Sequence, residues 1–177
     1  MIELIDPIIS SNKVDISTGL NVHYLEASKN NNNQPIALLL HGFPELSFSW
    51  RKIIPILAYQ GFRVIAPDMR GYGLTSGGTK KYDTNISEYR LLNLTTDILS
   101  LISALKINKV DLLVGHDAGS SVAGTSALIR PDIFKSVVMM SAPFTGAPNV
   151  DSNLSYQDPI HKDLEELNPP RKHYQWY

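Results

Sequence analysis

The chain has 177 residues, of which 43% are hydrophobic, and it carries 16 Lys and Arg against 17 Asp and Glu. This profile predicts one globular domain that is long enough to bury a core. The formal net charge of −1 excludes the strongly basic surface that binding to nucleic acid or acidic membranes requires, and the absence of Cys excludes disulfides, thiolate nucleophiles and Cys-ligated metals.

The N-terminal part of the chain predicts a β-hairpin. Its first ten residues, MIELIDPIIS, contain two acidic residues and no long apolar run, so they predict neither a signal peptide nor a membrane span, and we expect a cytoplasmic protein. Polar and apolar residues then alternate over residues 14–27 around a Ser-Thr-Gly break, which predicts the hairpin. The Asn-rich segment 29–34 is expected to form a surface loop.

Two short apolar runs, at residues 35–40 and 63–66, predict strands that are buried on both faces. Between them, apolar residues at helical spacing predict a helix near residues 47–60, ended by Gly61. Pro55 lies inside that span, so we expect it to kink the helix or to shift its start.

The second half of the chain continues this alternation. The capping pattern N-x-x-E at residues 85–88 predicts the start of a helix, and apolar residues at alternating three and four spacing continue it to residue 105. Further strands are predicted at residues 110–114 and 135–140, with a helix at 119–129 between them. Strands that alternate with helices predict an α/β fold with a mostly parallel sheet and helices on both faces.

The predicted alternation of strands and helices ends near residue 145. The remaining residues are richer in Pro, Asn and charge and include one amphipathic piece around 160–167. We therefore expect two parts, a sheet domain over residues 1–144 and a different unit over 145–177.

The most informative segment is GHDAG, at the end of a predicted buried strand and the start of a helix. It has the small-x-nucleophile-x-small pattern of a nucleophile elbow, in which glycines are required because the turn leaves no room for side chains. The central carboxylate would attack an alkyl carbon and form an ester, whereas the more usual Ser attacks an acyl carbon. The alternative is a plain glycine-bearing turn whose Asp caps the helix. The motif comprises Gly115, His116, Asp117, Ala118 and Gly119.

A second motif, HGFPE, follows the strand at residues 35–40. In this architecture the N–H after the nucleophile and an N–H from the loop after the earlier strand form the oxyanion hole. These donors would be the backbone N–H groups of Ala118 and Phe43, with Pro44 stiffening the loop. A plain strand-exit turn is the alternative. The motif comprises His41, Gly42, Phe43, Pro44 and Glu45.

With these motifs the sequence resembles the α/β-hydrolase superfamily and, within it, the epoxide hydrolases. The resemblance implies that Asp117 opens a small apolar epoxide to a covalent ester, which water hydrolyses to a vicinal diol with no metal or organic cofactor. It also implies a helical cap that begins at residue 145. The motifs that carry the resemblance are HGFPE, the Ser49-Trp50-Arg51 pattern, APDMRGYG at 66–73, GHDAG and SAPF at 141–144.

The resemblance also assigns a residue of the C-terminal segment HYQWY. In the family, cap tyrosines polarise the epoxide oxygen, and Tyr174, just before a Gln, matches the first of them. Its O–H would donate to the epoxide oxygen as the ring opens. The alternative is an aromatic-rich helix that packs on the core.

Two rival functions remain. Haloalkane and fluoroacetate-type dehalogenases resemble the pattern and would use the same Asp117, but they carry a Trp or an Arg where this chain has Ala118. The second rival is a noncatalytic protein of this fold that binds an apolar ligand or a partner. Neither the substrate nor the oligomeric state follows from the sequence.

The histidine that should activate water is the missing part of the pattern. After Asp117 only His161 and His173 occur, and neither follows a predicted buried strand. His41 and His116 are expected to be hydrogen-bonded structural residues, and His23 lies in the hairpin. We therefore expect a C-terminally truncated enzyme that forms the ester without turning over.

Overall fold

The computed structural model describes residues 5–29, 33–78, 86–142 and 166. The chain divides into two units, residues 1–144 and 145–177. Of the second unit only Glu166 is among the described residues, so the expected cap and Tyr174 lie outside them. The division into a hydrolase core and a cap stays a prediction.

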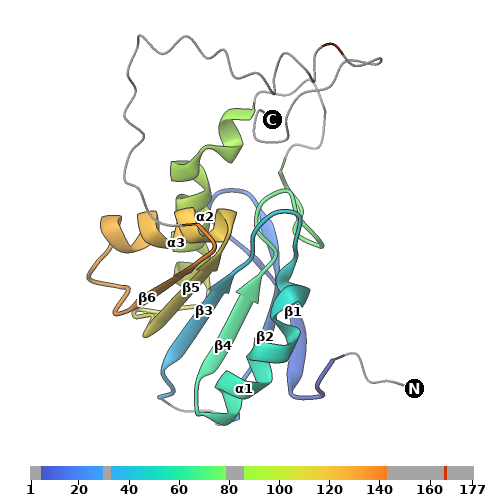
Figure 1. The fold of residues 1–177 in the computed structure, drawn as a ribbon, viewed down its shortest axis with the longest axis vertical. Coiled ribbons are helices and arrows are strands. Elements are labelled where there is room, and N and C mark those ends of the chain that lie inside the picture. The colour runs from blue at the N-terminus through green and yellow to red at the C-terminus, as the bar shows by residue number, and fades with distance from the viewer. Residues whose placement is uncertain (1–4, 30–32, 79–85, 143–165, 167–177) are drawn as a thin grey trace. The chain divides into compact units, whose positions relative to one another are not determined.

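The first unit is built on a six-stranded sheet with the strand order β1-β2-β4-β3-β5-β6 (Figure 1). β1 and β2 form the antiparallel end, and the other four strands run parallel to one another. The sequence prediction of a mostly parallel sheet is therefore confirmed. The strands are β1 (Ile9–Asp15), β2 (Asn21–Ala27), β3 (Ile36–Leu40), β4 (Arg63–Pro67), β5 (Leu112–His116) and β6 (Val137–Met140).

The predicted hairpin is present, and its first strand begins earlier than expected, at Ile9 rather than Val14. β1 and β2 pair from Ile9 opposite Ala27 to Asp15 opposite Asn21. Gly19 closes the turn with φ of +84°, a conformation that glycine adopts without steric cost.

Helices cover both faces of the sheet (Figure 1). Successive residues of a strand point to opposite faces, so the apolar central strands supply side chains to a core on each side. On one face, Leu39 and Val64 pack with Ile54 of α1 (Ile53–Tyr59). On the other, Leu38 and Ile65 pack with apolar residues of α2 (Leu91–Ala104) and α3 (Ala118–Ile129). β3 and β4 are therefore buried on both faces, as their continuous apolar sequences predict.

The predicted helix at residues 47–60 is divided into two parts. A 3₁₀ helix, η1 (Ser47–Lys52), comes first, and α1 then begins at Ile53, which places Pro55 in its first turn. Proline is tolerated there because the first N–H groups of a helix have no partner within it. Pro55 therefore shifts the start of the α-helix, and Gly61, with φ of +95°, ends it as predicted.

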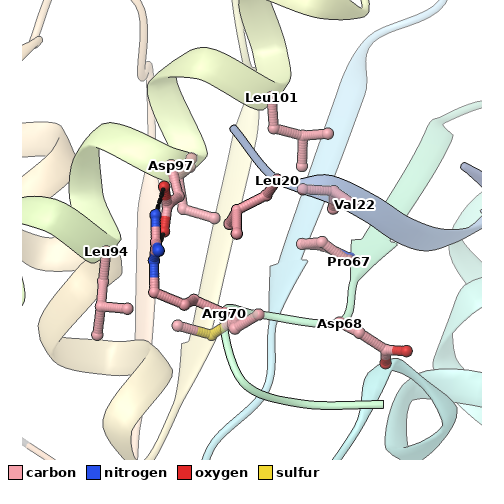
Figure 2. Close-up of a pocket in the computed structure, with 10 residues that line it drawn as sticks. Leu20, Val22, Pro67, Asp68, Arg70, Leu94, Asp97 and Leu101 are labelled. Atoms are coloured by element: carbon pink, nitrogen blue, oxygen red, sulfur yellow. Dashed lines mark hydrogen bonds and ion pairs between the residues drawn. The ribbon is translucent and has the colours of Figure 1, made fainter. Parts of the chain in front are cut away.

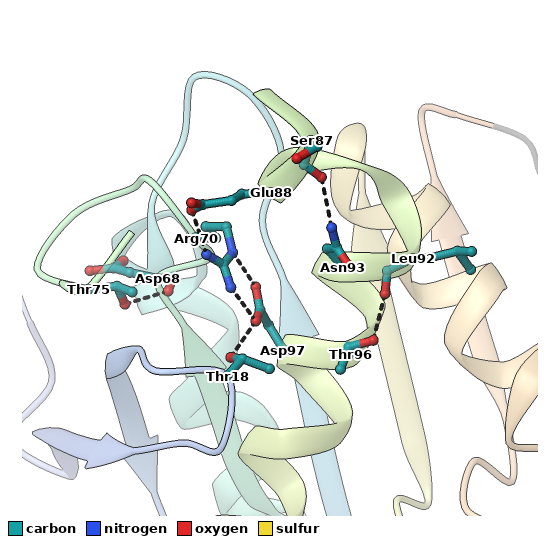
Figure 3. Close-up of polar contacts among 10 residues, drawn as sticks. All are labelled: Thr18, Asp68, Arg70, Thr75, Ser87, Glu88, Leu92, Asn93, Thr96 and Asp97. Atoms are coloured by element: carbon teal, nitrogen blue, oxygen red, sulfur yellow. Dashed lines mark hydrogen bonds and ion pairs between the residues drawn. The ribbon is translucent and has the colours of Figure 1, made fainter. Parts of the chain in front are cut away.

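The predicted capping pattern at residues 85–88 does not begin the long helix. A short 3₁₀ turn, η2 (Ile86–Tyr89), precedes α2, which begins at Leu91 after Arg90 in an extended conformation. Glu88 instead forms an ion pair with Arg70 at 3.1 Å (Figure 3). Arg70 also makes two hydrogen bonds to the buried Asp97 of α2, at 2.7 and 2.8 Å.

The strands and helix of the second half lie within two residues of their predicted bounds. β5 extends to His116, and α3 begins at Ala118 rather than at residue 119. None of the helices in the described part of the chain is both long and apolar enough to cross a bilayer.

Candidate active site

The two motifs from the sequence meet at the carboxyl ends of β3 and β5. These strands are parallel neighbours, with Leu40 opposite Gly115, so the residues that follow them leave the sheet side by side. Ligands of open α/β sheets bind at this edge.

The turn after β5 is held by close contacts between backbones. Asp117 has φ of +52° and ψ of −121°, a strained conformation for a residue with a side chain. A Cβ on Gly119 would come within 2.5 Å of the carbonyl oxygens of Leu40 and His41, and one on Gly115 would collide with the backbone of Gly119. The glycines are therefore steric requirements, as the elbow pattern predicts.

The carboxylate of Asp117 is directed at the loop after β3. The backbone N–H of Phe43 donates to its Oδ1 at 2.9 Å, while Asp117 itself is only half-buried. The N–H groups of Phe43 and Ala118 hold the pKa of this carboxyl below its ordinary value. The N-cap alternative fails in two respects, because the side chain makes no capping hydrogen bond and φ is positive, whereas N-cap residues are extended.

The expected oxyanion donors therefore lie against the carboxylate of Asp117 itself. This suits a carboxylate nucleophile, because the ester carbonyl that water would attack is the side-chain carbonyl of Asp117. Negative charge would develop on the oxygen that already accepts from Phe43, which is the geometry that electrostatic stabilisation requires.

His41 connects the Phe43 loop to the loop that follows β4. Its Nε2 accepts from the Met69 N–H at 2.9 Å, so its proton is on Nδ1, which donates to the Gly42 carbonyl at 2.9 Å. Burial is the largest influence on the ring and lowers its pKa, which favours this neutral form. The ring also meets the edge of Tyr72, with 4.9 Å between centroids. His41 therefore holds its own loop.

The comparisons with known proteins agree with this geometry. The family model for the alpha/beta hydrolase fold matches residues 35–166. The chain belongs to the α/β hydrolase family. Among curated relatives in it, the chain is 43% identical over 131 residues to an epoxide hydrolase of Caballeronia sordidicola, covering 73% of this chain and 37% of the relative. It is 37% identical over 162 residues to epoxide hydrolase B of Mycobacterium tuberculosis, covering 90% of this chain and 44% of the relative.

Solved structures of the family give the same picture. An epoxide hydrolase from Vigna radiata matches with a TM-score of 0.68 and 39% identity, over 77% of this chain and 41% of that one. Epoxide hydrolase I from potato, Solanum tuberosum, matches with a TM-score of 0.70 and 37% identity, over 78% and 41%. The chain thus spans less than half the length of these relatives.

Beside the elbow of this α/β hydrolase, His116 pairs with Glu45 of the HGFPE motif. Its Nδ1 lies 3.0 Å from the Glu45 carboxylate, and both side chains are partly exposed. His116 is thus the hydrogen-bonded residue that the sequence predicts. The pair joins the loop after β3 to the end of β5 at a second point.

The sequence reasoning missed one residue that fixes the elbow, the fully buried Ser120. Its hydroxyl donates to the Gly115 carbonyl at 2.7 Å, and its oxygen accepts from the Met140 N–H at 3.0 Å. Ser120 therefore joins the ends of β5 and β6 directly behind Asp117. A small polar residue in the first turn of the helix is the only signal in the sequence, and it reads as an ordinary helix residue.

Asp117 is partly exposed in the described part of the chain, and the two residues whose N–H groups bind it are exposed. Phe43 is 45% exposed, and Ala118 is exposed as well. The small pocket beside Arg70 and Asp97 is not the substrate site, because its volume is about 10 Å³, which holds at most one water (Figure 2).

Several candidate residues are not brought to this site. Tyr174, His161 and His173 lie outside the described residues. Asp132, which is not expected to belong to the site because it follows no strand, is exposed and paired with Arg130 at 2.6 Å, in the segment before β6.

Proposed function

We propose that Asp117 is the nucleophile of an epoxide hydrolase site. One carboxylate oxygen attacks an epoxide carbon, the ring carbon–oxygen bond breaks, and an alkyl ester of Asp117 forms. The opened oxygen takes a proton from an acid, and Tyr174 is our candidate. The observation that carries the proposal is the strained Asp117 whose Oδ1 is held by the Phe43 N–H, because it fixes one oxygen and orients the other for attack.

The ester would then be hydrolysed at its carbonyl carbon. Attack by water places negative charge on Oδ1, where the N–H groups of Phe43 and Ala118 already converge on the carboxylate. Water would need a base, and the described histidines are engaged elsewhere: His23 with Asp68, His41 with its loop, and His116 with Glu45.

The relatives support the epoxide as substrate, since the curated proteins and solved structures that match are called epoxide hydrolases. The negative charge of the Asp117 side chain also supports the proposal. Because its pKa is lowered, the side chain is a carboxylate at neutral pH and can act as the nucleophile.

Incubation of the 177-residue chain with styrene oxide tests the proposal. We expect a single alkyl adduct on the peptide that contains Asp117, with no continuing release of diol, because no described residue is placed to activate water. Asp117→Asn should lose the adduct entirely and keep the fold, since the amide is a poor nucleophile of similar shape. Absence of an adduct in the wild type would overturn the assignment of Asp117.

The same experiment separates the other possibilities. Steady diol release, proportional to time, would show that this form turns over. Halide release from haloalkanes or haloacids without any reaction with epoxides would assign a dehalogenase. Binding of an apolar ligand with neither reaction would assign a noncatalytic protein of this fold.

A further inference from the structure

A second set of reactive side chains lies on the hairpin side of the sheet, away from Asp117. The Ser11 hydroxyl on β1 is 2.8 Å from Nε2 of His23 on β2. The Nδ1 of His23 is 2.7 Å from Oδ2 of Asp68, in the loop after β4. Hydroxyl, imidazole and carboxylate thus form one continuous line of hydrogen bonds.

The carboxylate fixes the tautomer of the imidazole. An ionised Asp68 can only accept, so the His23 proton is on Nδ1. In the neutral imidazole Nε2 then carries no proton, so it can accept a hydrogen bond from the Ser11 hydroxyl at 2.8 Å. This is the arrangement in which an imidazole serves as general base for a serine.

The base is held rigidly. The Asp68 carboxylate also accepts from the backbone N–H groups of Ser47, at 2.8 Å, and Leu74, at 2.9 Å. Burial alone would raise the pKa of Asp68, but these donors together with His23 hold it below its ordinary value. The His23 N–H donates to the Thr75 hydroxyl at 3.0 Å, which fixes its backbone as well.

Of the three groups, only the serine, which would have to meet a substrate, is exposed to solvent. Asp68 and His23 are buried, with 2% and 5% of their surfaces exposed, whereas Ser11 is exposed on β1, the first strand of the sheet. Three strands, β2, β4 and β3, separate β1 from β5. At about 4.8 Å between neighbouring strands, the two sites are roughly 19 Å apart.

We propose that Ser11 is the nucleophile of a second site, for acyl transfer from small esters, with His23 as its general base and Asp68 orienting His23. The Ser11 proton passes to Nε2 of His23 as Oγ bonds to the ester carbonyl carbon. The bond from that carbon to the leaving oxygen then breaks, and the leaving group takes the proton from His23. Water, deprotonated by His23, releases the acid and restores the Ser11 hydroxyl.

The position of Ser11 selects the class of ester. Ser11 is exposed on its strand, so we expect long or branched acyl groups to gain little from contacts with the described residues. Esters with good leaving groups, such as phenyl esters of short acids, need the least stabilisation of negative charge on the carbonyl oxygen. These are the substrates that a base-assisted serine can use.

The test is acylation of the 177-residue chain by p-nitrophenyl acetate. We expect a burst of p-nitrophenolate and an acetyl group on Ser11, located by fragmentation of the peptide so that Lys13 on the same strand is distinguished. Ser11→Ala should abolish the burst, because the hydroxyl that forms the acetyl ester is gone, whereas loss of the general base alone should slow acylation by roughly 100-fold. Ser10→Ala is the matched control, because the Ser10 hydroxyl donates to the Glu26 carbonyl instead, and it should react as the wild type does.

His23→Gln tests the base separately, and it should slow acylation of Ser11 while its circular dichroism stays native. If that variant does not fold, the two serine variants decide the matter without it. Equal bursts in Ser11→Ala and Ser10→Ala, or acetylation confined to lysines, would overturn the proposal.

Discussion

Two aspartates follow parallel strands that lie on either side of β3 in the same sheet, and yet their surroundings differ. Asp68 comes directly after β4 and Asp117 directly after β5. Asp68 is 2% exposed, and its two oxygens accept from Ser47, Leu74 and His23. Asp117 is half-buried and accepts from Phe43, and its pKa is also lowered, mainly by backbone N–H groups.

The comparison shows that a lowered pKa does not by itself mark a nucleophile. Backbone N–H groups stabilise both charges. The difference lies in what remains after those bonds are made: Asp68 has both oxygens bound and no access, whereas Asp117 keeps access to solvent at its elbow. Access to solvent, rather than ionisation, separates the buried Asp68 from the carboxylate that we propose as the nucleophile.

The largest effect should come from adding a methyl group to the elbow. Gly119→Ala places a Cβ against two carbonyl oxygens, so we expect a loss of about 3 kcal/mol in unfolding free energy, measured by urea denaturation. Gly19→Ala is the matched control, because Gly19 has a positive φ but no atom within 4 Å of its Cβ position. It should cost only about 1 kcal/mol. Equal losses would mean that backbone contacts do not hold the elbow.

A smaller effect is expected from Asp68→Asn, about 2 kcal/mol at neutral pH, because the amide loses charge-assisted hydrogen bonds. The folded pKa of Asp68 is below its ordinary value of 3.8, so its stabilisation is complete above that value and is lost as the pH falls through the folded pKa. The difference between wild type and variant should therefore shrink only in that acid range. Unfolding curves at several pH values check this, and a difference that does not change with pH would contradict it.

The smallest effect should come from Asp132→Asn. This carboxylate makes a short ion pair with Arg130, but both side chains are largely exposed, and exposed pairs contribute little. We expect no measurable change in melting temperature. A clear fall in melting temperature would mean that a short distance stabilises an ion pair even when it is exposed. Burial would then not be what distinguishes one carboxylate from another.

The elbow could be predicted from the sequence because its requirements are local. The strand end, the carboxylate and the two glycines around it lie within residues 115–119, and the sterics of one turn explain both glycines. The same holds for Pro55, whose ring geometry determines where α1 can begin. The sequence predicts Phe43 as an oxyanion donor from the position of its motif, and the structure adds that its N–H donates to Asp117 itself.

Other parts could not be predicted because distant segments compete for the same groups. Glu88 has the spacing of a capping residue, yet Arg70, 18 residues earlier, pairs with it. The line from Ser11 through His23 to Asp68 spans β1, β2 and the loop after β4, and no pattern in the sequence marks these residues as partners. These three residues come together only because β2 lies between β1 and β4 in the sheet.

The interlocked glycines around Asp117 also limit how this site can change by mutation. Gly42, Gly115 and Gly119 each face backbone atoms or Asp117, and backbone atoms cannot be removed by a second substitution. A side chain introduced at one of these glycines therefore cannot be accommodated by shortening a neighbouring side chain. At the exposed positions Phe43 and Ala118, by contrast, the hydrogen bonds to Asp117 come from backbone N–H groups, which any residue except proline supplies.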